Sequence, residues 1–159
     1  MIVLPLLRSP FPALAGGAPD MNRVLELTNV ERQNAGLAPL TLSPQLNDAA
    51  QHYSEVLASD GCFGHTCGPV PDMTQRDALA GYSGWSAIGE NIAAGYASPE
   101  AVVAGWMASP GHRENILSPD YREIGIGVSA GGEYGVYWTQ EFGGRGGGAP
   151  VADLEGDDE

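Results

Sequence analysis

Apolar residues recur at helical spacing in four segments of this chain, and capping residues mark where the segments begin. The second segment is the clearest, because Ser43 is a good N-cap and Pro44 suits a first helical turn. Its apolar residues, all on one helical face, are Leu46, Ala49, Ala50, Tyr53 and Leu57. Across all four segments the pattern predicts helices over 21–35, 44–60, 73–80 and 99–108.

The period of the pattern changes from helical to alternating near residue 123. Ile124, Ile126 and Val128 alternate with glycines, and a second alternating run over 134–142 follows a Gly-Gly turn. This pattern predicts an antiparallel hairpin, and 89–94 is an additional candidate strand. Helices followed by a late hairpin predict an α+β fold, in which helices cover both faces of a small antiparallel sheet.

Length and composition are consistent with one soluble domain. The 159 residues are 43% hydrophobic, which suffices for a single core, and no apolar run approaches the roughly 20 residues of a membrane span. Twenty acidic residues stand against seven basic residues, all arginine, and the formal net charge is −13. Such a chain should repel nucleic acid and anionic membrane surfaces, so we exclude both as partners.

The two ends differ in composition from the middle of the chain. Residues 1–19 form a broken apolar stretch that resembles either a truncated signal peptide or a disordered leader. Residues 144–159 begin rich in glycine and end in a cluster of acids, as expected of a flexible acidic tail. The predicted domain therefore covers 20–143.

Two histidines and one glutamate are the candidate site residues. His65, Glu90 and His112 are far apart in sequence, but two imidazoles and a carboxylate suit a divalent metal or a proton-transfer site if the fold brings them together. Each has a plainer interpretation, since a single histidine is more often a structural residue and a single glutamate is often a surface acid. The remaining histidine, His52, lies on the second predicted helix and is assigned to packing or solvent contact.

The two cysteines flank one of these candidates. Cys62 and Cys67 enclose His65, and we favour a small disulfide loop that stiffens the backbone around this histidine. Two free thiols are the alternative, and a zinc site would need a second nearby pair of ligands. The disulfide interpretation implies an extracellular protein.

Several motifs, in order, resemble the CAP superfamily of cysteine-rich secretory proteins, antigen 5 and pathogenesis-related proteins, in its bacterial single-domain form. The resemblance runs from about Val24 to Phe142. Its most specific motifs are Gly64-His-Thr66, Gly89-Glu-Asn-Ile92, Trp106-Met-Ala-Ser-Pro-Gly-His112 and Tyr137-Trp-Thr-Gln-Glu-Phe-Gly143. The resemblance implies a three-layer α-β-α sandwich with a histidine cleft on one side. It implies His65 and His112 as metal ligands and Glu90 as a residue of their pocket.

The chain departs from the family pattern at one position. Many eukaryotic relatives have a second glutamate three residues after a tryptophan, and here Ser109 follows Trp106 at that distance. Glu114 or Glu141 is available as a second carboxylate, but neither matches the family position, so the fourth member of the site stays unassigned. Two imidazoles and one acid can still hold zinc with water in an open position.

Three hypotheses about function follow. We favour a secreted, non-enzymatic module that uses the cleft to bind a small ligand, a cell-wall component or a protein surface, with or without zinc. The alternative is a metal-dependent hydrolase or peptidase, in which Glu90 would act as the base or would orient a metal-bound hydroxide. The third is a scaffold whose cleft has lost such a role. No Gly-x-Ser-x-Gly motif is present to support serine-hydrolase chemistry.

Overall fold

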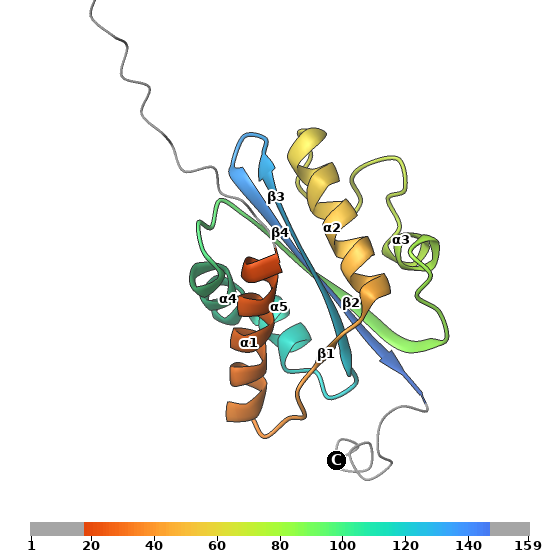
Figure 1. The fold of residues 1–159 in the computed structure, drawn as a ribbon, viewed down its shortest axis with the longest axis vertical. Helices are drawn as coiled ribbons and strands as arrows, with labels where there is room; N and C mark the ends of the chain where they lie inside the picture. The colour runs from red at the N-terminus through yellow and green to blue at the C-terminus, as the bar shows by residue number, and fades with distance from the viewer. Residues whose placement is uncertain (1–17, 147–159) are drawn as a thin grey trace, which may run out of the picture.

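The structure is a computed structural model that describes residues 18–146, in which helices cover both faces of a central sheet (Figure 1). The elements, in chain order, are α1 (Ala18–Asn34), β1 (Thr41–Leu42), α2 (Pro44–Ser59), α3 (Met73–Leu79), β2 (Trp85–Ala94), α4 (Pro99–Ala108), α5 (Pro110–Ile116), β3 (Glu123–Gly131) and β4 (Gly135–Arg145). The four predicted helices, the hairpin and the additional strand are all present. The helix α5 and the two-residue strand β1 were not predicted. The proposed leader, up to residue 17, and the acidic tail, from residue 147, lie outside the described residues.

The sheet has the strand order β1-β3-β4-β2, so the site-bearing strand β2 lies at one edge. β4 pairs antiparallel with both β3 and β2, as expected, whereas the short β1 pairs parallel with β3 and makes the sheet mixed. Helices α1, α4 and α5 cover one face, and α2 and α3 cover the other (Figure 1). The predicted α-β-α sandwich is therefore confirmed. Within residues 18–146 no helix has the length and apolar character needed to cross a bilayer.

Alternating residues of β3 pack against the two helical layers in different ways. Its isoleucines and Val128 enter the large apolar core beneath α1 and α4. Gly125 and Gly127 face α2, where a Cβ on Gly127 would lie 2.2 Å from the backbone oxygen of Ala50. The glycines therefore let the backbone of α2 pack directly on the strand.

The register of β2 against β4 places the site residues. Glu90 is opposite Glu141, and Asn91 is opposite Gln140. Because successive side chains of a strand point to opposite faces, the two glutamates face α2 and the two amides face α5. Strands β2 and β4 thus present two carboxyl groups to one helical layer and two neutral amides to the other.

Candidate functional site

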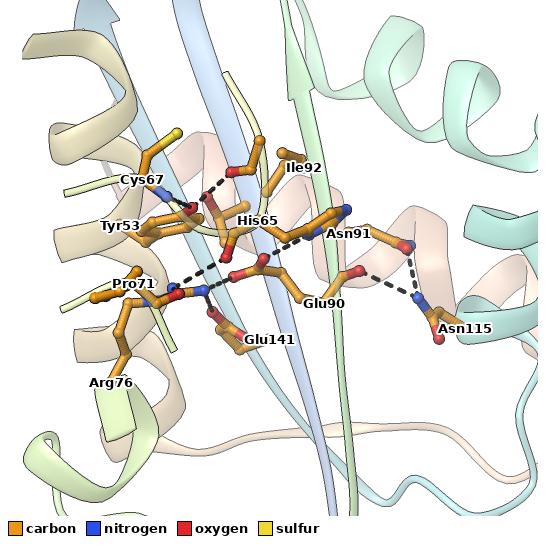
Figure 2. Close-up of polar contacts among 12 residues, drawn as sticks. Tyr53, His65, Cys67, Pro71, Arg76, Glu90, Asn91, Ile92, Asn115 and Glu141 are labelled. Carbon is orange, nitrogen blue, oxygen red and sulfur yellow. Dashed lines mark hydrogen bonds and ion pairs between the residues drawn. The ribbon is translucent and has the colours of Figure 1, made fainter. Parts of the chain in front are cut away.

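Glu90 is the centre of the site. It lies on β2, and its side chain is only 3% exposed. Its Oε1 lies 2.6 Å from Nδ1 of His65, and its Oε2 accepts a hydrogen bond of 2.5 Å from Nη2 of Arg76. Figure 2 shows His65 and Arg76 converging on this carboxylate. The structure therefore brings His65 and Glu90, two of the three predicted residues, into direct contact.

His65 presents its second ring nitrogen away from Glu90. A carboxylate can only accept a hydrogen bond, so Nδ1 carries the proton, and Nε2 of the neutral ring keeps its lone pair. The His65 side chain is 56% exposed. The hydrogen bond to Glu90 raises the pKa of His65, against the lowering effect of partial burial. The imidazole is thus oriented by a buried acid and open on its other side.

The loop that carries His65 is fixed by a disulfide and by Tyr53 of α2. Cys62 and Cys67 are bridged, as predicted, with Cα atoms 5.9 Å apart, and no free cysteine is found in the described chain. The Tyr53 hydroxyl donates to the carbonyl oxygen of Gly64 at 2.5 Å and accepts from the backbone N–H of Cys67 at 3.0 Å (Figure 2). These contacts hold the backbone on both sides of His65.

Arg76 of α3 connects this loop with the sheet. Its guanidinium donates to the carbonyl oxygens of Pro71, at 2.7 Å, and His65, at 3.3 Å, as well as to Glu90. The same group lies 3.6 Å from the centre of the Tyr53 ring, in cation–π geometry. One arginine therefore supports both the carboxylate and the loop of the histidine.

Two further carboxyl groups are buried beside this arginine. Asp77 and Glu141 are fully buried, and their carboxyl oxygens make no hydrogen bond within residues 18–146. Burial raises the pKa of Asp77 to about 7, and burial together with the charge of Glu90 raises the pKa of Glu141 well above its usual value. Both carboxyl groups therefore hold a proton to a higher pH than an exposed carboxyl group does.

Glu90 behaves differently from its two neighbours. Burial alone would raise its pKa, but its contacts with His65, Glu141 and Arg76 outweigh that effect and lower it. The pKa values of the two opposed carboxyl groups are therefore shifted in opposite directions, so a proton in the pair favours Glu141 over Glu90. Directly opposed like charges are unfavourable in a sheet, which agrees with the raised pKa of Glu141.

His112 approaches from the opposite face of β2. It lies on α5, where Asn91 donates to its backbone oxygen at 3.1 Å. Asn115 of the same helix donates to Asn91 Oδ1 at 2.9 Å and to the backbone oxygen of Glu90 at 3.2 Å (Figure 2). Burial lowers the pKa of His112, and the charge of His65 lowers it further. The two imidazoles are thus close enough to interact electrostatically, although no hydrogen bond joins them in the described chain.

The remaining candidate residues differ in whether they lie near Glu90. Glu141 lies beside Glu90, whereas Glu114 is exposed on α5, two residues beyond His112 and on another helical face. His52 is exposed on α2, as the solvent-contact interpretation required. No group of three or more metal-ligating side chains is found within residues 18–146. A metal at this site would therefore take two protein nitrogens and complete its coordination with water or a bound molecule.

Sequence analysis missed Arg76, Tyr53 and Asp77. Tyr53 was assigned only to the core face of its helix, and Arg76 and Asp77 lie in a short helix where charged residues are usually solvated. Two of the seven residues of α3, Arg76 and Asp77, are both charged and buried. Burial is not visible in a sequence, so no sequence signal distinguished these two residues.

Comparison with known proteins places these features in a family. The family model described as "CAP: Cysteine-rich secretory protein family" matches residues 25–142. YkwD of Bacillus subtilis is 40% identical over 126 residues, which cover 77% of this chain and 46% of that protein. The membrane protein YlbC of the same organism is 34% identical over 120 residues, covering 76% of this chain and 33% of that protein. The chain thus spans less than half the length of these two relatives.

Solved structures agree with the fold. An extracellular protein containing an SCP domain from Bacillus anthracis superposes with a TM-score of 0.74 at 28% identity, covering 80% of this chain and 41% of that one. An outer surface protein from Borrelia burgdorferi gives a TM-score of 0.73 at 22% identity, covering 82% of this chain and 98% of that one.

Proposed function

The chain belongs to the CAP, or cysteine-rich secretory protein, family, and from that premise we propose that it is an extracellular binding module whose two-histidine site holds a divalent metal, with zinc the best fit. The extracellular assignment is supported by the disulfide and by the two structural neighbours, one an extracellular protein and the other an outer surface protein. The metal assignment is supported by the chemistry of the donors.

The pairing of His65 with Glu90 is the observation that carries the metal proposal. A histidine that ligates a metal through one ring nitrogen commonly donates its other N–H to a carboxylate, which fixes the ring and raises its basicity. The contact of 2.6 Å between Nδ1 of His65 and Oε1 of Glu90 has this form. Glu90 would then be an orienting group behind the ligand, because both of its oxygens are already engaged.

His112 is the proposed second ligand. Its lowered pKa favours the neutral imidazole, which is the form that binds metals. The helix that carries it is tied to β2 through Asn91 and Asn115. Two imidazoles with open coordination positions would let a small ligand, a cell-wall component or a protein side chain complete the site.

The test is a calorimetric titration of the untagged protein with zinc. We expect about one equivalent in the wild type and loss of that site in both His65→Ala and His112→Ala. His52→Ala is the matched control, because it removes the one other histidine of the chain from an exposed position and should change nothing. Glu90→Gln should weaken binding roughly 10- to 100-fold, as loss of an outer-shell carboxylate does.

The proposal fails if folded wild-type protein binds no zinc at neutral pH. It also fails if binding survives in both His65→Ala and His112→Ala, or if His52→Ala alone abolishes it. Thermal unfolding of each variant without metal separates loss of the site from loss of the fold.

A second candidate function is hydrolysis, and the same imidazole–carboxylate contact favours it. A histidine oriented by a buried acid, with an open Nε2, has the geometry of a general base. Turnover of peptide, ester or peptidoglycan substrates by the wild type, lost in His65→Ala and retained in His52→Ala, would support it. Absence of turnover with and without added zinc would leave the binding module as the better description.

A further inference from the structure

A pocket lies behind the histidine loop, between α2 and α3. Its volume is about 390 Å³, within the range of roughly 300–1,000 Å³ typical of small-molecule sites. Most of its wall is apolar, formed by Ala49, Tyr53, Val56, Cys67, Val70 and Leu79. No part of the proposed metal site except its supporting residues reaches this pocket.

Leu79 makes this pocket different from an ordinary surface depression. It is 75% exposed, the highest value among the large hydrophobic residues of the described chain, and it lies at the end of α3 on the pocket wall. An apolar molecule in the pocket would cover this side chain and remove its surface from water, which is favourable. Leu79 on its own would be an ordinary exposed residue, but here it continues the apolar wall of a concave pocket, which is the usual form of a small-molecule site.

The polar groups of the pocket define the ligand's charge. Arg76 lines the pocket, but its guanidinium is already bound to Glu90 and is 4% exposed, so it is not available to an anion. Asp48 and His52 lie one helical turn apart on α2 and are both exposed at the pocket. Because Arg76 is paired with Glu90, the exposed Asp48 leaves the pocket with an acidic rim, which disfavours an anionic head and favours a cationic one.

We propose that this pocket binds a small amphiphile with an apolar body and a cationic head group. The body would lie against Val56, Val70 and Leu79, and the head would lie near Asp48. This site is distinct from the proposed metal site and does not depend on it.

The pocket shares two residues with the support of His65. Tyr53 forms part of the pocket wall and holds the backbone of Gly64 and Cys67, while Arg76 forms another part and holds Glu90. Figure 2 shows both residues on the α2 side of Glu90. A ligand in the pocket would therefore contact the two groups that position the imidazole, so its binding should be detectable at His65.

The experiment is an NMR titration of the full chain with octyltrimethylammonium, below the concentration at which it forms micelles. We expect saturable shifts of the amides of Val56, Cys67 and Leu79, and a His65 ring shift with the same dissociation constant. Tetramethylammonium, which is the head group alone, should give no saturable shift. Octanoate, which has a similar chain and the opposite charge, should bind at least about tenfold more weakly.

Two variants locate the site. Leu79→Ser should weaken octyltrimethylammonium binding about tenfold, because it removes one of the three apolar side chains against which the ligand body would lie. Val30→Ser is the matched control, since Val30 is also apolar and 45% exposed, but it lies on α1 across the sheet. Asp48→Asn should reduce the difference in affinity between octyltrimethylammonium and octanoate.

Three outcomes would overturn the proposal. Equal or tighter binding of octanoate contradicts the cationic head group. Unchanged affinity in folded Leu79→Ser, or equal weakening in Val30→Ser, shows that the amphiphile binds elsewhere. Pocket amides that do not shift at all under saturating ligand exclude the site.

Discussion

Two pairs of polar residues occupy neighbouring positions of the same two strands, and the protein stabilises them by different means. Asn91 and Gln140 face α5, whereas Glu90 and Glu141 face α2. On the α5 side, Gln140 donates to the Thr28 hydroxyl at 2.9 Å, and Asn91 donates to Gln140 Oε1 at 3.1 Å. This side of the site is a chain of neutral amides.

The α2 side is charged and incompletely hydrogen-bonded. Arg76 is surrounded by Glu90, Glu141 and Asp77, and two of these three carboxyl groups have no hydrogen-bond partner in the described chain. Buried ionic groups contribute little net stability, and removing one member of the set is costly. The amide side therefore positions α5 and His112 through hydrogen bonds between neutral groups. The charged side instead lowers the pKa of Glu90, the carboxylate that contacts His65.

The largest effect on stability is expected from removing the cation of the charged side, Arg76. Arg76→Ala should lower the free energy of unfolding by about 3–5 kcal/mol at neutral pH, because it leaves an ionised, buried Glu90 without its guanidinium. Urea unfolding followed by circular dichroism measures the loss. Arg113→Ala is the control, since this arginine is exposed on α5 and its loss should stay within about 0.5 kcal/mol. An equal loss in the two variants would contradict a special role for Arg76.

Stability should also depend on pH through the carboxyl groups of the charged side. The pKa of Asp77 is raised from 3.8 to about 7, so the folded protein keeps this proton over a range in which the unfolded chain has lost it. Stability should therefore fall as the pH rises from about 4 to about 7, by a quantity on the order of 4 kcal/mol. The raised pKa of Glu141 acts in the same direction.

Asp77→Asn identifies the source of this pH dependence. The amide does not ionise, so the variant should be more stable than the wild type at pH 8, and its profile between pH 4 and 8 should be flatter. Urea midpoints across this range provide the measurement. The lowered pKa of Glu90 contributes in the opposite direction, and its contribution is lost as the pH falls below about 4.5. A wild-type profile that rises toward pH 8 would contradict the assignment.

On the amide side, a single substitution should cost less. Asn91→Ala removes the hydrogen bonds to Gln140 and to the backbone of His112, so we expect a loss of about 1–3 kcal/mol with little dependence on pH. Hydrogen exchange should become faster in α5 and stay unchanged in α2. A pH-dependent loss would mean that the two sides are coupled.

The smallest effect is expected from the disulfide. Cys62→Ser combined with Cys67→Ser should lower stability by about 2 kcal/mol or less, because the bridge closes a ring of only a few residues. The local consequence should be clearer, with faster amide exchange over 63–66 than in α2. If exchange in the loop stays slow, Tyr53 and Arg76 alone are sufficient to hold His65.

Several features of the fold were readable in the sequence because they depend on local patterns. The face of α2, the hairpin and the strand at 89–94 follow from side-chain period, which local backbone geometry imposes. Ser43 does accept a hydrogen bond from the backbone N–H of Leu46, as its capping position predicted. In contrast, α5 was missed although it is as long as α3, because the run Ser109-Pro-Gly111 is typical of the end of the preceding helix and hides the start of a new one. β1 was missed because two residues give no alternation.

For the site, the family motifs singled out His65, Glu90 and His112, and the structure places His65 and Glu90 in contact. The metal itself stays a prediction. Glu141 was named in the sequence only as an unassigned carboxylate, and strand register alone placed it opposite Glu90.

The sequence by itself determined which segments would be helices and strands, that the two cysteines could close a loop, and which histidines deserved attention. Only the tertiary structure decided that Arg76 and Tyr53 hold the His65 loop, that the pKa of Glu141 is raised, and that the two histidines approach β2 from opposite faces. The physical reason is that burial and strand register join residues far apart in the chain. Ionisation and hydrogen bonding depend on those neighbours and not on residue type.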